Sequence, residues 1–149
     1  MSAIRVTSLA KEFPGSAVAL DDGSFEIEPG DFVSLLGPSG CGKTTMLRCI
    51  AGLETPDAGE IEVSGKVVYS TLGRQNVMVP PEKRALSMVF QQYALWPHMN
   101  VFDNVAFGLT MRRASKSETN KKVRKALESV ELWHARDRKV SELSGGQQQ

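Results

Sequence analysis

An eight-residue stretch constrains this chain more than any other feature of its sequence. Gly37-Pro38-Ser39-Gly40-Cys41-Gly42-Lys43-Thr44 fills every fixed position of the phosphate-loop pattern G-x-x-x-x-G-K-[S/T]. Glycine lets the backbone curl so that successive N–H groups point at phosphate oxygens, which side chains would otherwise obstruct. Lys43 adds a mobile positive charge, and the Thr44 hydroxyl is a suitable ligand for Mg²⁺. The stretch therefore predicts a site for a nucleoside triphosphate.

The residues on either side of the loop support this prediction. Residues 31–36 are mostly apolar and are expected to form a strand that enters the loop, and residues 45–51 a helix that leaves it and ends at Gly52. The phosphates would then lie at a helix N-terminus, where the backbone dipole favours negative charge. A glycine-rich turn without a ligand is the alternative, but two glycines at this spacing arise at only roughly one position in 200.

Composition places the chain among ordinary globular proteins. Its 149 residues are 41% hydrophobic and 23% charged, with a formal net charge of +1. Near-neutral charge gives no general attraction to nucleic acid, and no apolar run approaches the length of a membrane span. The first residues lack the apolar segment of a secretory signal. We therefore expect one domain, or part of one, located in the cytoplasm and without a nucleic-acid partner.

The chain has two cysteines, Cys41 and Cys49. A helix would separate them by about 12 Å, which is too far for a disulfide. Free thiols fit a reducing compartment. Because Cys41 lies near a helix N-terminus, we expect it to have some thiolate character and bound ATP to shield it from alkylation.

The hydrophobic pattern predicts strands in the first part of the chain and helices in the second. Strands are expected around residues 4–9, 24–27, 61–63, 66–69 and 86–90, with a loop over most of residues 70–84. Two helical faces follow, made by Val101, Val105, Ala106 and Leu109, and by Val123, Ala126, Leu127 and Val130. A capping box over residues 115–118 precedes the second helix. The pattern changes at Gln91, so we expect a phosphate-loop core with an antiparallel portion over residues 1–90 and a mainly helical part over residues 91–149.

Basic residues are concentrated in the helical part. They are Arg112, Arg113, Lys116, Lys121, Lys122, Arg124 and Lys125. Such a group is compatible with a lipid or nucleic-acid surface. We favour a solvated helix face instead, because the apolar neighbours already define the buried side.

A second signature stands at the end of the sequence. Leu143-Ser144-Gly145-Gly146-Gln147 follows the phosphate loop and an intervening Val89-Phe90-Gln91-Gln92. A Ser hydroxyl and two glycine N–H groups before a helix suit a second phosphate contact. This pentapeptide, together with the phosphate loop, resembles the signature of the ATP-binding cassette (ABC) family. The resemblance implies an α/β phosphate-loop NTPase, the ABC ATPase, with an antiparallel β subdomain and a helical subdomain.

The resemblance also implies a shared site. In this family two chains form a head-to-tail dimer, a homodimer here, that buries two ATP molecules between Lys43 of one chain and Ser144 to Gln147 of the other. Gln91 matches the family's glutamine that touches Mg²⁺ and the attacking water. Phe13 matches the aromatic residue that stacks on adenine, although a lone Phe is more often a core residue.

The candidate residues fall into three groups. The catalytic candidates are Lys43 and Gln91, and the Mg²⁺ candidates are Thr44 and Gln91. The ATP-binding candidates are Phe13, Gly37, Pro38, Ser39, Gly40, Cys41, Gly42, Lys43, Thr44, Thr45, Ser144, Gly145, Gly146 and Gln147.

The resemblance is closer over residues 86–109. This region is similar to bacterial importer ATPases for ferric iron, polyamines, sulfate, phosphonates and sugars. In that group the surface after the glutamine receives a short helix of a transmembrane permease subunit, which would hold the chain at the inner face of the cell membrane. We expect Tyr93, Leu95 and Trp96 to lie near that contact, with packing in the core as the alternative.

The family's next segments are missing from this sequence. They include the Walker B strand with its Mg²⁺-binding Asp, the catalytic Glu and the switch His, and neither His98 nor His134 stands in that His position. The resemblance therefore implies an N-terminal fragment truncated before the Walker B strand, which would bind ATP poorly and hydrolyse it hardly at all. The alternatives are a nucleotide-binding fragment without turnover, another phosphate-loop enzyme such as a kinase or GTPase, and a cassette protein that acts outside transport.

Overall fold

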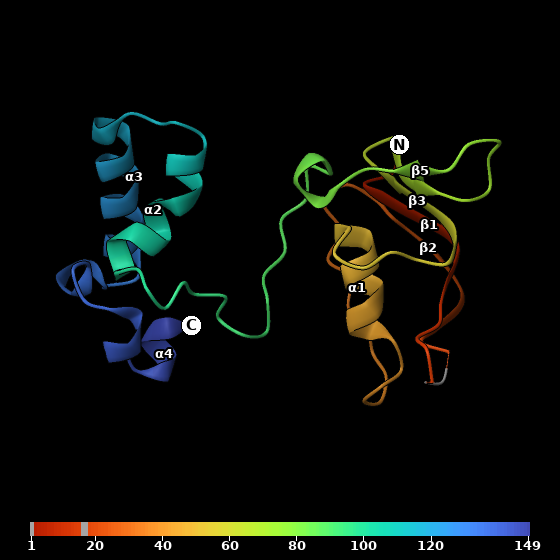
Figure 1. The fold of residues 1–149 in the computed structure, drawn as a ribbon, viewed down its shortest axis with the longest axis horizontal. Helices are drawn as coiled ribbons and strands as arrows, with labels where there is room; N and C mark the ends of the chain where they lie inside the picture. Colours follow the sequence, from red (N-terminus) through yellow and green to blue (C-terminus); the bar gives the residue numbers. More distant parts are fainter. Residues whose placement is uncertain (1, 16–17) are drawn as a thin grey trace. The chain divides into compact units, whose positions relative to one another are not determined.

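The structure, a computed structural model, describes residues 2–15 and 18–149. The chain forms two compact units, residues 1–88 and residues 89–149. The first unit contains strands β1 (Ile4–Lys11), β2 (Leu20–Ile27), β3 (Ala58–Val63), β4 (Lys66–Ser70) and β5 (Val77–Met78), helix α1 (Lys43–Ala51) and the 3-10 helix η1 (Pro81–Lys83). The second contains helices α2 (Val101–Met111), α3 (Lys116–Ser129) and α4 (Gly145–Gln148), and the 3-10 helices η2 (Trp133–Ala135) and η3 (Val140–Glu142) (Figure 1).

The first unit is built on one antiparallel sheet with the strand order β2-β1-β3-β4-β5. The register pairs Ile4 with Ile27 on one side and with Val63 on the other. The register shifts after Val6, where Ser8 adopts a positive φ of 47° and its N–H donates to Ser24 Oγ at 2.8 Å. The predicted strands over residues 4–9, 24–27, 61–63 and 66–69 and the antiparallel portion are confirmed.

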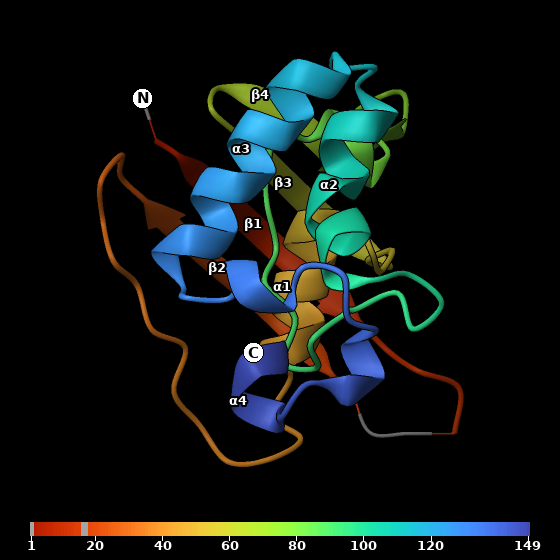
Figure 2. The same ribbon diagram turned by 90° about the vertical axis from the view of Figure 1, so that its left-hand side faces the viewer.

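One face of this sheet packs against α1 (Figures 1 and 2). The helix contributes Met46, Cys49 and Ile50, whose spacing places them on one side. The strands contribute a set of buried residues, in which the register shifts of β1 and β3 interrupt strict alternation. The buried ones are Val6, Leu9, Leu20, Ile61, Val63, Val68 and Tyr69. This single apolar core holds α1, and therefore the loop before it, against the sheet.

The second unit packs α2 and α3 around a core of its own. Asn100 caps α2 by accepting from the N–H of Asp103. Ser115 caps α3 by accepting from the N–H of Glu118, which is the first of the two bonds of the predicted capping box. The core residues are Val101, Ala106, Val123, Leu127, Ala135, Val140 and Leu143. The predicted buried faces of the two helices contained more residues than are buried, because Val105, Ala126 and Val130 are exposed.

The basic residues between positions 112 and 125 are all exposed. Lys122 pairs with Glu118 at 2.6 Å, and Arg124 pairs with Glu128 at 2.8 Å, each one turn apart along α3. Such exposed pairs contribute little to stability. This agrees with the solvated helix face that we expected.

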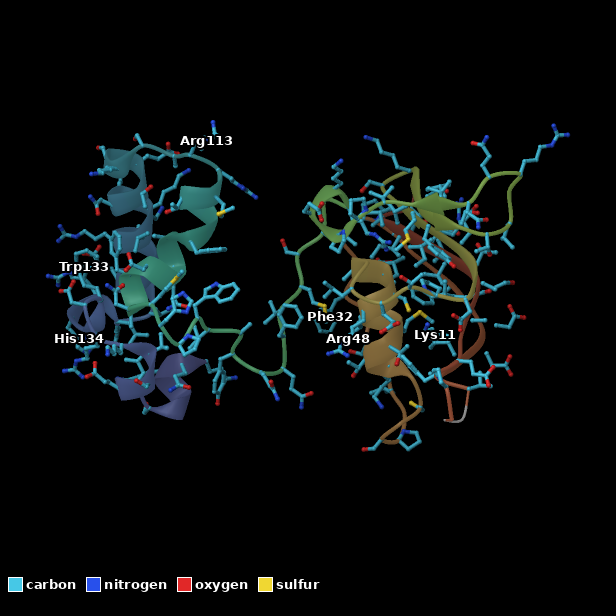
Figure 3. The ribbon with its side chains drawn as sticks, in the orientation of Figure 1. Lys11, Phe32, Arg48, Arg113, Trp133 and His134 are labelled. Atoms are coloured by element: carbon cyan, nitrogen blue, oxygen red, sulfur yellow. The ribbon has the colours of Figure 1, made fainter. Side chains whose placement is uncertain are left out.

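Two predicted strands are not formed. Residues 31–36 and 86–90 have no strand pairing in the structure, and Phe32 and Leu36 are 95% and 90% exposed. Figure 3 labels Phe32. A strand is stable only when a neighbour accepts its hydrogen bonds, and within residues 2–15 and 18–149 no strand pairs with either segment. The apolar pattern was therefore a wrong indication of strand structure in these two segments.

The C-terminus of α1 is closed by Gly52 and by hydrogen bonds from the Arg84 side chain. Gly52 ends the helix in the left-handed region with a φ of 80°. The Arg84 guanidinium, 3% exposed, donates to Cys49 O at 2.8 Å, Ile50 O at 3.0 Å and Val79 O at 2.8 Å. Burial lowers the pKa of Arg84, and the helix dipole and these carbonyls stabilise its charge. The last residue of the loop predicted over residues 70–84 is thus Arg84, whose side chain donates hydrogen bonds to carbonyls at the C-terminus of α1.

Replacing Arg84 by Met should destabilise the first unit by about 2–4 kcal/mol, because two helix-terminal carbonyls lose a charged donor in a buried place. The free energy of unfolding in urea, followed by circular dichroism, measures this loss. Lys83→Met, at the exposed neighbouring position, is the matched control and should change the stability by less than about 0.5 kcal/mol. Equal effects of the two variants would contradict the role of Arg84.

Candidate nucleotide-binding site

The phosphate loop between residues 37 and 42 is held in a curled conformation that requires glycine. Gly40 and Gly42 have φ values of 85° and 90°, in the region that side chains rarely adopt. A Cβ on Gly42 would lie 2.1 Å from the carbonyl oxygen of Ala19, and a Cβ on Gly37 would lie 2.6 Å from Cys41 Sγ. The loop therefore presents bare backbone on its inner side and packs closely against the end of the segment before β2.

The N-terminus of α1 is free to bind an anion. Gly42 precedes the helix, no side chain caps it, and the first turn contains no acidic residue. The first N–H groups of a helix have no partner within the helix, and the dipole makes this end positive. A phosphate group suits such a position.

Lys43 lies inside the curl of the loop. Its Nζ donates to Gly37 O at 2.8 Å and to Pro38 O at 2.7 Å, and it lies 3.4 Å from Cys41 Sγ. Phosphate oxygens would compete with these acceptors for the three N–H groups of the ammonium. The charge that the sequence predicted for phosphate binding is thus already within the loop.

The described residues include no group of three or more His, Cys, Asp or Glu side chains that could hold a metal ion. The Thr44 hydroxyl lies in the exposed first turn of α1. Mg²⁺ is usually bound by a few protein oxygens together with substrate phosphates. Thr44 beside a phosphate cradle fits that pattern, and Thr45, one residue further, is half-buried.

The second signature forms the start of a helix in the second unit. Ser144 caps α4, its Oγ accepting from Gln147 N at 3.4 Å while Gln147 Oε1 accepts from Ser144 N at 3.0 Å. Gln148 Nε2 donates to Val140 O at 3.0 Å and Leu143 O at 3.1 Å, which ties α4 to η3. Ser144, Gly145 and Gly146 are exposed, so this turn is accessible to another molecule.

Three features agree with one family model. They are the phosphate cradle, formed by residues 37–42 and Lys43, the turn capped by Ser144, and the sheet with its helices. A model described as ABC transporter matches residues 20–149. The chain belongs to the ABC transporter family. Its fold is the ABC ATPase fold that the sequence predicted.

Relatives within the ABC transporter family include import proteins. The spermidine/putrescine import ATP-binding protein PotA of Bacteroides thetaiotaomicron is 49% identical over 148 residues, which are 99% of this chain and 30% of that protein. The trehalose/maltose import ATP-binding protein MalK of Thermococcus litoralis is 46% identical over 149 residues, 100% of this chain and 39% of that protein. The chain spans about a third of the length of these relatives.

A solved structure supports the fold of this ABC transporter family member. CbiO1 of Clostridium perfringens, described as part of the ABC transporter complex CbiONQ, matches with a TM-score of 0.76 and 25% identity. The match covers 99% of this chain and 57% of that one. Within the described part of this chain, no helix combines the length and the apolar character needed to cross a bilayer.

The ABC resemblance assigned residues to the adenine base, to Mg²⁺ and to the permease contact, and the structure gives the surroundings of each. Phe13 is half-buried just after β1, and Lys11 Nζ lies 5.2 Å from its ring centroid. Gln91 is exposed at a bend in the second unit. Tyr93 and Trp96 are about half exposed, whereas Leu95 packs against the helical core.

The structure also identifies a residue that sequence reasoning missed near Trp96. Asn104 on α2 accepts from Trp96 N at 2.8 Å and donates to Trp96 O at 3.1 Å and to Asn100 O at 2.9 Å. The Trp96 ring packs on Phe107 with centroids 5.4 Å apart. This exposed aromatic is therefore held in place by α2. No local pattern distinguishes Asn104, because its partners lie eight and four residues before it.

The two cysteines differ sharply in surroundings, and both are free. Cys41 is exposed in the loop. Cys49 is fully buried in α1, and burial, with a smaller effect of the Glu54 charge, raises the pKa of Cys49 to about 11. Neither cysteine takes part in a disulfide in the structure.

We expect iodoacetamide at pH 8 to alkylate Cys41 much faster than Cys49. Cys49 is inaccessible and has very little thiolate at that pH, because its pKa is about 11. Mass spectrometry of the two cysteine peptides over time measures both rates, and unfolding in urea should make Cys49 reactive as a control. Similar rates in the folded protein would contradict the burial of Cys49.

Proposed function

We propose that this chain is the ATP-binding part of an ABC importer subunit that binds MgATP and drives transport by ATP hydrolysis. The observation that carries the proposal is the phosphate cradle, in which bare glycine backbone, an uncapped helix N-terminus and the Lys43 ammonium converge. The exposed signature turn at Ser144 is a second site of the kind that contacts phosphate in ABC proteins.

Each candidate residue has a role in this proposal. The N–H groups of the loop and of the first turn of α1 bind the phosphates, and Lys43 neutralises their charge. The Thr44 hydroxyl and the Gln91 amide oxygen are candidate ligands of Mg²⁺, which would neutralise phosphate charge during phosphoryl transfer. Phe13 stacks on the base.

The functional assembly is a head-to-tail homodimer in this proposal. The signature residues Ser144 to Gln147 of one chain would contact the nucleotide held by Lys43 of the other. ATP contacts available only in the closed dimer then favour closure, and hydrolysis removes them.

The proposed partners are transmembrane permease subunits, which would place the protein at the cytoplasmic face of the membrane. The exposed side chains of Tyr93 and Trp96 support a contact there, since Asn104 and Phe107 hold Trp96 in place. We propose no cargo, because a polyamine importer protein and a sugar importer protein match this chain at 49% and 46% identity.

The variant Lys43→Ala should weaken MgATP binding about 10- to 100-fold, because it removes charge-assisted hydrogen bonds to phosphate. Isothermal titration calorimetry with MgATP measures this change. Lys66→Ala, which removes an exposed lysine at the start of β4, is the matched control and should bind like the wild type. If wild-type protein binds no MgATP, or if Lys43→Ala binds it equally well, the proposed function is wrong.

The variant Trp96→Ala should weaken binding to the permease subunits in membrane vesicles and leave MgATP binding intact. Met111→Ala, at an exposed apolar residue at the end of α2, is the control for loss of surface apolar area. Cosedimentation with the vesicles measures the first property, and calorimetry measures the second. Loss of MgATP binding in Trp96→Ala would instead indicate a role in core packing.

A further inference from the structure

A cluster of charges lies at the end of β1, directly before the residue proposed to stack on the base. Lys11 Nζ lies 3.2 Å from Asp57 Oδ1 and 3.4 Å from Glu54 Oε1, and its side chain is only 12% exposed. The second oxygen of Asp57 accepts from Glu12 N at 2.7 Å. Lys11 Nζ also lies over the Phe13 ring, 5.2 Å from the centroid.

These contacts keep the Lys11 ammonium charged and in place. Burial opposes the charge, but hydrogen bonds and charges from Asp57 and Glu54 outweigh it and raise the pKa of Lys11. The Glu12 N–H and the Lys11 ammonium lower the pKa of Asp57. Both groups are therefore ionised at neutral pH, and one face of the Phe13 ring is occupied by a cation.

The same residues connect the Phe13 segment to the phosphate loop. The N–H of Ala19 donates to Lys11 O at 2.9 Å, and the N–H of Asp57 donates to Ala10 O at 2.9 Å. The carbonyl of Ala19 lies against Gly42, where a Cβ would be 2.1 Å from it. A shift of Lys11 would thus be transmitted by two short contacts to the loop that holds the phosphates.

We propose that Lys11 and Asp57 are positioning residues that orient the Phe13 ring for the nucleotide base and fix its place relative to the phosphate loop. This inference rests on the proposed ATP-binding function. Asp57 fixes the backbone of the segment through Glu12, and Lys11 covers one face of the ring, which leaves the other face for the base. A cation on one face also draws π density away from the opposite face, which favours stacking with an electron-rich purine.

Lys11 differs from another paired basic residue of the same strand, Arg5, in its burial and in its partners. Arg5, on the same strand, also pairs with two carboxylates, Glu26 at 2.9 Å and Glu62 at 3.5 Å, but its side chain is about half exposed. Exposed pairs of that kind contribute little. Lys11 differs in its burial, in its contact with an aromatic ring and in its bond to a backbone that touches the phosphate loop. Arg5 is therefore a matched control.

The test separates binding of the base from binding of the phosphates. Calorimetry compares MgATP with magnesium tripolyphosphate, which has no base, for wild type, Lys11→Met and Arg5→Met. Lys11→Met keeps the apolar stem and removes the charge. It should weaken MgATP binding about threefold to tenfold and leave tripolyphosphate binding unchanged, whereas Arg5→Met should bind both like wild type.

Two further variants test the mechanism independently of folding. Asp57→Asn keeps an oxygen for the Glu12 N–H and removes the charge facing Lys11, so it should show the same base-specific loss. In a Phe13→Leu background, Lys11→Met should cause no further loss of MgATP affinity. In the wild-type background, Lys11→Arg keeps the positive charge and should retain most of the wild-type affinity.

The outcomes distinguish this inference from the proposed function. An unchanged MgATP affinity in both Lys11→Met and Asp57→Asn, or an equal loss for MgATP and tripolyphosphate, overturns the positioning role and leaves ATP binding established. If wild-type protein binds neither ligand, or binds MgATP independently of Lys43, the proposed function fails and the positioning role fails with it.

Discussion

The packing of α1 against the antiparallel sheet is the interaction on which the rest of the first unit depends. Met46, Cys49 and Ile50 are buried against the strands, and this fixes the axis and the rotation of the helix. The two ends then have opposite requirements. In the proposed function the N-terminus keeps its N–H groups free for an anion, while the last carbonyls need donors. Gly42 precedes the helix without a capping side chain, and Arg84, 35 residues after Cys49, supplies donors to the last carbonyls.

Two lysines near the candidate site, Lys43 and Lys11, have partners of different charge. Lys43 lies inside the loop, and its Nζ donates to the backbone carbonyls of Gly37 and Pro38 and to no carboxylate among the described residues. Lys11, by contrast, is neutralised by Glu54 and Asp57. In the proposed function the first lysine binds phosphate, and the second holds the segment around Phe13. The two lysines of this unit have different electrostatic surroundings because their partners differ.

Sequence reasoning predicted the segments whose structure depends on near neighbours. The curl of residues 37–42, the helix that ends at Gly52, and the cap at Ser115 all follow from backbone sterics or from bonds within three residues. Strands β1 to β4 were expected from the hydrophobic pattern, whereas the short β5 lies within the stretch predicted as mostly loop. The strand predicted over residues 31–36 was wrong, because a strand also needs a partner, and the apolar pattern says nothing about whether one is in place.

The sequence by itself determined the phosphate cradle and the family, since glycine at Gly37, Gly40 and Gly42 and the Lys43 charge act within one short loop. Only the tertiary structure decided how that loop is supported. The bonds from Arg84 to Cys49 and Ile50, from Asp57 to the residues before Phe13, and from Asn104 to Trp96 connect groups that the chain brings together by folding. Such contacts have no local pattern, because the free energy that forms them comes from burial of the surrounding core.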